Sequence, residues 1–185
     1  MATELAFRFN ERRATQACAL LLERAGGRSN YTRILKLLYL ADRRAMQTCA
    51  SPMTGSSIVN MKNGPVLSEV YDCIKGSGQH CFWDAHIATD GFDIRLLNPA
   101  GDSHLCDFDV EVLSELAEQY ADASFSTMID VVHELPEWSD PAPAKVAPLH
   151  AADVLRVLGY DEEAIEAHAQ TNEHIRFVDN LLGLS

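Results

Sequence analysis

The sequence predicts a mainly α protein of the α+β class, with a small β-hairpin or sheet in the middle of the chain. Apolar residues recur at helical spacing over most of the 185 residues. Between those stretches lies Asp90-Gly91, a dipeptide that favours a two-residue hairpin turn. Hydrophobic residues make up 47% and charged residues 23%, which is typical of a globular protein. We expect one domain over residues 1–140 and a helical extension over residues 141–185 that packs on it or binds a partner.

Two long helices are expected at the start of the chain. Residues 9–25 and 31–48 repeat apolar side chains every three or four positions, and Gly26-Gly27 separates the two stretches. Asn30 or Ser29 can cap the second helix, because a short polar side chain accepts hydrogen bonds from the first free amides. The second helix is predicted to be amphipathic, with an apolar stripe and a basic outer face.

An extended segment is expected next, over residues 57–62. It ends at the corner Asn63-Gly64-Pro65, where glycine tolerates positive φ and proline suits the first turn of a helix. A short helix is therefore expected over residues 65–75.

A β-hairpin is expected around Asp90-Gly91. Counting outward from this turn gives two cross-strand pairs on the inner face, Ile87 with Ile94 and Ala85 with Leu96. Trp83 is expected on that inner face, whereas His86 and Arg95 are expected on the outer one. The hairpin and the segment near residue 60 can share one sheet.

The second half of the chain is expected to be helical again. Ser124 is a plausible helix cap, and Pro136 ends that helix. Residues 140–145 read as an extended linker. In the last helix, a stripe at helical spacing comprises Ile165, His168, Asn172, Ile175, Val178 and Leu182. The four helices are expected over residues 109–121, 124–134, 149–158 and 161–181.

Charge is spread unevenly along the chain, whose net charge is −12. Residues 1–75 hold 11 Lys and Arg against 6 Asp and Glu, whereas residues 76–185 hold 4 against 21. Either the acidic part receives a basic partner, or the two parts complement each other within the fold. The acidity argues against a dedicated nucleic-acid binder, because phosphate contacts need a positive footprint.

A cytoplasmic location is expected. The sequence has no apolar run long enough for a membrane span, and its first residues lack a basic region followed by an apolar core. Five cysteines without a close pair are most simply explained as buried thiols in a reducing compartment. They are Cys18, Cys49, Cys73, Cys81 and Cys106.

We expect no catalytic residue, no metal and no cofactor. The sequence lacks a nucleophile elbow, a phosphate-binding loop and a dinucleotide fingerprint. One alternative is a small hydrolase in which His133 is a general base beside Glu134 and Glu137. Another is a metal site, although no C-x-x-C pair is present. Its candidate ligands are His80, Cys81, His86, His104 and Cys106.

DNA binding is a further alternative, in the form of an autorepressor. The first two helices resemble a helix–turn–helix, and the basic outer face of the second has Arg33, Lys36, Arg43 and Arg44 for phosphate contacts. However, the loop between these helices is longer than the usual tight turn.

Five short motifs occur in a distinctive order. They are Leu35-Lys36-Leu37-Leu38-Tyr39-Leu40-Ala41-Asp42, Thr54-Gly55, Lys62-Asn63-Gly64-Pro65-Val66, Ser68-Glu69-Val70-Tyr71-Asp72 and His133 to Trp138. Together, over about residues 15–140, they resemble the Panacea domain, the SocA-like family of antitoxins. The resemblance implies that the chain binds and neutralises a cognate toxin encoded beside it. It further implies, for the SocA type, a proteolytic adaptor that delivers the toxin to the ClpXP protease.

Most signature residues are expected to be structural, because the binders of many different toxins must share a scaffold rather than a contact surface. The expected scaffold residues are Leu35, Leu38, Tyr39, Asp42, Gly64 and Pro65. A buried carboxylate at Asp42 needs a partner, for which Lys62 or a backbone N–H is suitable. The residues expected to contact a partner are Lys62, Asn63, Tyr71, Asp72, Trp83, His86, Arg95 and Trp138.

Overall fold

The computed structural model describes residues 5–183. Residues 1–4, on which the expectation about a secretory signal partly rests, and residues 184–185 lie outside this range. The helices are α1 (Glu11–Arg24), α2 (Tyr31–Cys49), α3 (Ser68–Lys75), α4 (Cys81–His86), α5 (Asp107–Gln119), α6 (Phe125–His133), α7 (Ala151–Val157) and α8 (Glu162–Leu181). The strands are β1 (Arg28–Asn30), β2 (Ile58–Met61), β3 (Gly64–Leu67), β4 (Ile87–Asp90), β5 (Asp93–Leu96) and β6 (Val146–Leu149). The expected mainly helical α+β class is confirmed.

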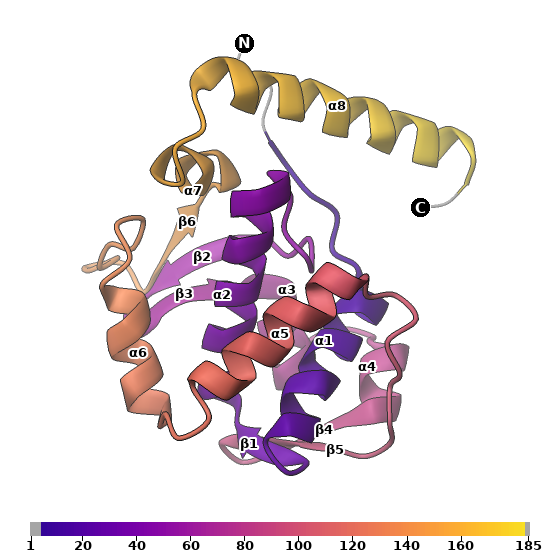
Figure 1. Cartoon of the computed structure of the whole chain (residues 1–185), viewed down its shortest axis with the longest axis vertical. Coiled ribbons are helices and arrows are strands. Elements are labelled where there is room, and N and C mark those ends of the chain that lie inside the picture. The colour runs from indigo at the N-terminus through magenta and orange to yellow at the C-terminus, as the bar shows by residue number, and fades with distance from the viewer. Residues whose placement is uncertain (1–4, 184–185) are drawn as a thin grey trace.

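Helix α2 is the central element. It rises through the middle of the molecule, with α5 crossing in front of it and α1 and α6 on either side (Figure 1). Asn30 caps it as expected, because its Oδ1 accepts hydrogen bonds from the amides of Thr32 (2.9 Å) and Arg33 (3.4 Å). Most of the side chains from Ile34 to Met46 are buried. The core therefore surrounds α2 rather than lying on one side of it.

The expected corner at Gly64-Pro65 is a strand instead. Strands β2 and β3 form an antiparallel hairpin in which Met61 pairs with Gly64, so the chain turns at Lys62-Asn63. Helix α3 begins at Ser68, three residues later than expected. All four residues of β3 are buried, and this burial outweighs the preference of proline for a helix start. Pro65 is tolerated because β3 is an edge strand.

The second hairpin differs from its expected register by two residues. Ile87 pairs with Leu96 rather than with Ile94, and the turn is Gly91-Phe92. A shift of two residues preserves the faces, so Ile87 and Ile94 are both buried as expected. The observed register places Asp90 opposite Asp93, where both carboxylates contact Arg28.

The segment before this hairpin is helical, which corrects the expectation of a strand from residue 83. Trp83, Ala85 and His86 belong to α4. Trp83 is only 1% exposed, and its amide and that of Phe82 each donate to Glu11 Oε1 at 2.9 Å. The carboxylate of α1 thus satisfies two amides at the start of α4, where a helix has free donors.

The strands form two separate three-stranded sheets, ordered β1-β5-β4 and β3-β2-β6, so the expectation of one shared sheet is wrong. Strands β1 and β6 were not expected. Strand β6 pairs Leu149 with Ile58 of β2, so residue 149 does not begin a helix, and α7 starts at Ala151. These strands of three and four residues have partners that are remote in sequence, and no local pattern marks them.

The buried residues of helix α8 lie in its first half, whereas its second half lines a pocket together with residues 7–9. Ile165 and Ala169 are buried, and Asn172 Nδ2 donates to the carbonyl of Ala6 at 3.0 Å. The second half extends across the top of the molecule, away from the body (Figure 1). Its apolar side chains are exposed, namely Ile175, Phe177, Val178, Leu181 and Leu182.

The expectation of buried thiols holds for two of the five cysteines. Cys18 and Cys73 are buried, whereas Cys49, Cys81 and Cys106 are exposed.

Within residues 5–183, none of the helices combines the length and the apolarity that are needed to cross a bilayer.

Gly64 provides a test of the β2–β3 hairpin. Its φ is +99°, and a Cβ added there would lie 2.4 Å from Val132 Cγ2. We expect Gly64→Ala to lower the free energy of unfolding by about 2–5 kcal/mol, from left-handed strain and overpacking combined. Urea denaturation measures the change. The matched control is Gly91→Ala, which has φ +65° and open space around it and should lose only about 1 kcal/mol. Equal losses of unfolding free energy in the two variants would show that the closeness of Val132 to Gly64 does not add to the destabilisation.

Candidate functional site

The signature residue Glu137 lies in a buried polar cluster with α2. Its carboxylate accepts hydrogen bonds from Tyr39 Oη (2.8 Å) and from Arg43 Nε (2.6 Å). The Glu137 side chain is fully buried, and that of Arg43 is 20% exposed. Burial and the neighbouring carboxylate raise the pKa of Tyr39 far above its usual range. The cluster therefore joins the segment after α6 to α2.

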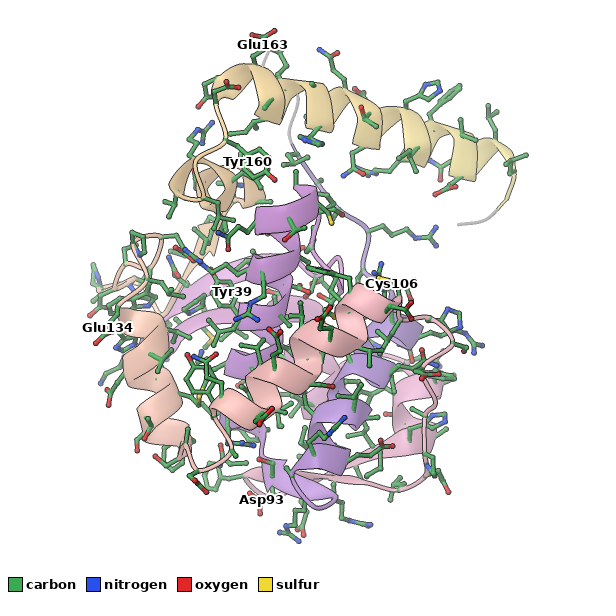
Figure 2. All side chains as sticks on the ribbon, in the orientation of Figure 1. Tyr39, Asp93, Cys106, Glu134, Tyr160 and Glu163 are labelled. Atoms are coloured by element: carbon green, nitrogen blue, oxygen red, sulfur yellow. The ribbon has the colours of Figure 1, made fainter. Side chains whose placement is uncertain are left out.

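The candidate general base His133 does not meet a carboxylate in this cluster. Its ring stacks on Trp138, with centroids 3.8 Å apart and an interplanar angle of 15°. Trp138 Nε1 donates to the carbonyl of Met61 at 3.3 Å. Glu137 turns to Arg43 and Tyr39 instead, and Glu134 lies at the outer edge of the molecule, whereas Tyr39 lies within it (Figure 2). These contacts hold the C-terminal end of α6 and the corner after it in place, and they do not form an acid–base pair.

Asp42 is held by the Thr54-Gly55 motif. Its carboxylate accepts hydrogen bonds from the amide of Thr54 (2.8 Å) and from Thr54 Oγ1 (2.5 Å). Burial raises the pKa of Asp42 to about 7. The expectation of a backbone N–H partner is confirmed. The alternative partner, Lys62, lies elsewhere, at the pocket described below.

The basic face of α2 is covered, which corrects the expectation of an outer face. Arg33 donates to the carbonyls of Ala123 (3.0 Å) and Tyr120 (2.9 Å), between α5 and α6. Lys36 is 1% exposed. Arg44 pairs with Glu115. These cations bind other parts of the fold and hold α5 and α6 against α2. They are therefore not arranged to contact phosphates.

Ion pairs connect the basic and acidic parts of the chain. Arg13 pairs with Asp109 of α5, as Arg43 does with Glu137 and Arg44 with Glu115. Of the two explanations for the charge asymmetry, complementation within the fold is thus present. A grouping of three or more His, Cys, Asp or Glu suited to a metal ion is not found in the described part of the chain, so the proposed zinc ligands do not converge there.

A pocket of about 620 Å³ lies between α2, the β2–β3 turn, α3 and the loop before β6. It brings together Lys62, Asn63 and Tyr71, three of the residues expected to contact a partner. Its other lining residues are Tyr31, Thr32, Leu35, Lys36, Met61, Val66, Asp140, Pro141, Ala142, Ala144 and Lys145. This size is within the range of pockets that bind small ligands or anchoring side chains.

Lys36 is the buried cation of this pocket. Its Nζ donates to the carbonyl of Pro65 at 2.8 Å, and burial lowers its pKa to about 7. The partners expected from sequence did not include Lys36, Tyr31 or the loop over residues 140–145. The helical pattern placed Lys36 on the outer face, so the sequence contains no signal for its burial, which follows from the packing of β3 and α6 against α2.

The remaining expected contact residues lie apart from the pocket or beside it. Trp83 is in the core, and His86 is half-buried, with Nδ1 2.8 Å from the carbonyl of Phe82. Arg95 is exposed on β5, and Asp72 is exposed next to Tyr71. The structure buries all six residues expected to form the scaffold, Leu35, Leu38, Tyr39, Asp42, Gly64 and Pro65.

Glu137 tests the buried cluster. Replacing Glu137 with Gln removes the charge that pairs with Arg43, and we expect a loss of about 3–5 kcal/mol in the free energy of unfolding. The matched control is Glu115→Gln, which breaks the more exposed pair with Arg44 and should cost less than about 1 kcal/mol. Chemical denaturation of both variants compares them directly. A loss no greater than that of the control would contradict a structural role for Glu137.

Lys36 generates a pH-dependent prediction. Its pKa is about 7 in the fold, against 10.5 for an ordinary lysine, so between these values the unfolded chain binds more protons. Burial of the charged amine lowers the free energy of unfolding most below pH 7, and this cost decreases as pH rises. Relative to Lys36→Met, the wild type should gain up to about 1.4 kcal/mol of stability per pH unit between pH 7.5 and about pH 9.5. Denaturation of both proteins across this range measures the gain. Lys62→Met, at an exposed site, controls for loss of a lysine, and a pH-independent difference for Lys36→Met would refute the assignment.

The family model described as antitoxin SocA-like, Panacea domain, matches residues 34–139. The match begins in α2 and ends just after Trp138, so it spans both hairpins, α5, α6 and the Glu137 cluster. It leaves α1, β6, α7 and α8 outside. Neither the curated proteins nor the solved structures contain a significant match. Because the family model covers more than half of the chain and confirms the resemblance of the ordered motifs, this chain belongs to the SocA-like antitoxin family with a Panacea domain.

Proposed function

We propose that this protein is an antitoxin that neutralises a cognate toxin by binding it directly. The observation that carries the proposal is the family match over residues 34–139. The burial of the signature residues supports it in a second way. Leu35, Leu38, Tyr39 and Asp42 are all at most 2% exposed, so these residues maintain the fold and leave the surface to vary with the toxin.

The second half of α8 is part of the proposed contact surface. It lies outside the family match, as a surface that recognises one particular toxin should. Its row of exposed apolar side chains from Ile175 to Leu182 has the composition of an interface core. Acidic residues, including Glu173 and Asp179, accompany that row. Residues 146–158 are unsuited to such a role, because β6 and Leu155 belong to the sheet and the core.

A finer part of the proposal is delivery of the bound toxin to ClpXP, as in the SocA type. Delivery requires one surface for the toxin and another for the protease.

The toxin proposal is tested with the protein encoded by the neighbouring gene. Co-expression should restore growth, and the two proteins should copurify in a fixed stoichiometry. Persistent growth arrest, with the antitoxin accumulating in folded form by circular dichroism, would refute it. The lifetime of the toxin, measured with and without ClpXP, then separates the two modes of action. A lifetime that shortens only when this protein and ClpXP are both present supports delivery, whereas an unchanged lifetime leaves masking alone.

A further inference from the structure

All four lysines of this acidic chain gather at one pocket. Lys36, Lys62 and Lys145 line it. The fourth, Lys75, lies with its Nζ 4.4 Å from the ring centroid of Tyr31 and 5.3 Å from that of Tyr71, and both rings line the same pocket. Lys62, Lys75 and Lys145 are exposed, whereas Lys36 is buried. The chain as a whole has a net charge of −12, so this concentration of positive charge is local.

The interior of the pocket is mainly apolar and aromatic. Leu35, Met61 and Val66 line it together with Tyr31 and Tyr71, whose ring centroids are 6.5 Å apart. Tyrosine rings and apolar side chains with a polar surround are the usual composition of a site for an anchoring side chain. The positive groups are therefore arranged around an apolar interior.

The pocket has little negative charge of its own. Among its described lining residues, Asp140 is the one carboxylate. Its Oδ1 accepts a hydrogen bond from the amide of Ala142 at 2.9 Å, which fixes the loop before β6. Carboxylates of a ligand would thus meet lysines here, whereas over most of the remaining surface they would meet a repulsive field.

We propose that this pocket binds an acidic segment of the toxin, with a large apolar side chain inserted between the tyrosines and flanking carboxylates on Lys62, Lys75 and Lys145. The proposal rests on the proposed function for the identity of the partner. The negative net charge of the chain adds to this preference, because the acidic parts of the surface repel an acidic segment.

The distribution of the lysines favours a peptide over a small anion. A compact phosphate or carboxylate site needs several donors that converge on one point. Here the exposed lysines come from three elements, the β2–β3 turn, α3 and the loop before β6. The buried amine of Lys36 already donates to Pro65. Separate charges around an apolar interior match a segment that has several carboxylates and one apolar anchor.

The chemistry of the pocket is tested without the toxin. Two capped peptides are titrated into the full chain by NMR, Asp-Glu-Leu-Phe-Asp-Glu and its uncharged counterpart Asn-Gln-Leu-Phe-Asn-Gln. We expect the acidic peptide to shift the methyl signals of Met61 and Ala142, and to bind at least about tenfold more tightly than the uncharged one. The double reversal Lys62→Glu with Lys145→Glu should weaken binding about tenfold or more. The control Arg12→Glu with Arg24→Glu makes the same change in net charge at exposed positions of α1 that do not line the pocket and should weaken binding far less.

Equal binding of the two peptides, no binding at about 1 mM, or equal losses in both double variants would overturn the proposal. So would tighter binding of a short single-stranded oligonucleotide than of the acidic peptide at the same ionic strength. The same two double variants are then compared in copurification with the toxin, and only the pocket variant should lose the complex. If the wild type binds the toxin and the pocket variant binds it equally well, the pocket assignment fails while the proposed function stands. If the wild type does not bind the toxin, the proposed function fails, and with it the assignment of the segment to a toxin.

Discussion

Helix α2 lies in the middle of the molecule although it carries ionisable groups on several sides, and each of those groups needs a partner. A buried charge without a partner costs more than packing can return. Arg33 therefore donates hydrogen bonds to two carbonyls in the loop between α5 and α6, and Lys36 donates one to the carbonyl of Pro65. Asp42 is satisfied by Thr54 and Arg43 by Glu137. These contacts determine where β3, α5, α6 and the segment after α6 lie, so most of the fold follows from the requirement to satisfy one helix.

This constraint explains the form of the family signature. Three of its motifs are far apart in sequence, but each contributes a partner for an ionisable group of the central helix. The Thr54-Gly55 turn donates a hydrogen bond to Asp42, and the Gly64-Pro65 strand accepts one from Lys36. The corner after His133 provides Glu137, which accepts a hydrogen bond from Tyr39. The motif residues that bond to α2 lie inside the fold, so they identify the family without identifying the toxin.

The uneven charge of the chain has two consequences in the folded state. Part of the basic first segment is neutralised by the acidic second one, through pairs such as Arg13 with Asp109 and Arg44 with Glu115. The arginines are used largely in this way, because a planar guanidinium suits fixed pairing with carboxylates and carbonyls. Within residues 5–183 no ion pair joins a lysine to a carboxylate, and the four lysines gather at the pocket beside α2. The acidic chain thus has a local concentration of lysines around an apolar pocket.

Local sequence pattern predicted the helices other than α4, the caps at Asn30 and Ser124, and the faces of the second hairpin. Helices form from hydrogen bonds between residues four positions apart, and the face of a strand residue depends only on its parity, so local pattern is sufficient for both. Tertiary packing determines the strands β1 and β6, helix α4, the two-residue shift of the hairpin, and the strand at Gly64-Pro65. It also decided the pocket, in which Lys36, Lys62 and Lys145 meet from positions remote in sequence. Such contacts depend on which segments become neighbours once the core is packed, and no periodicity within a segment records that.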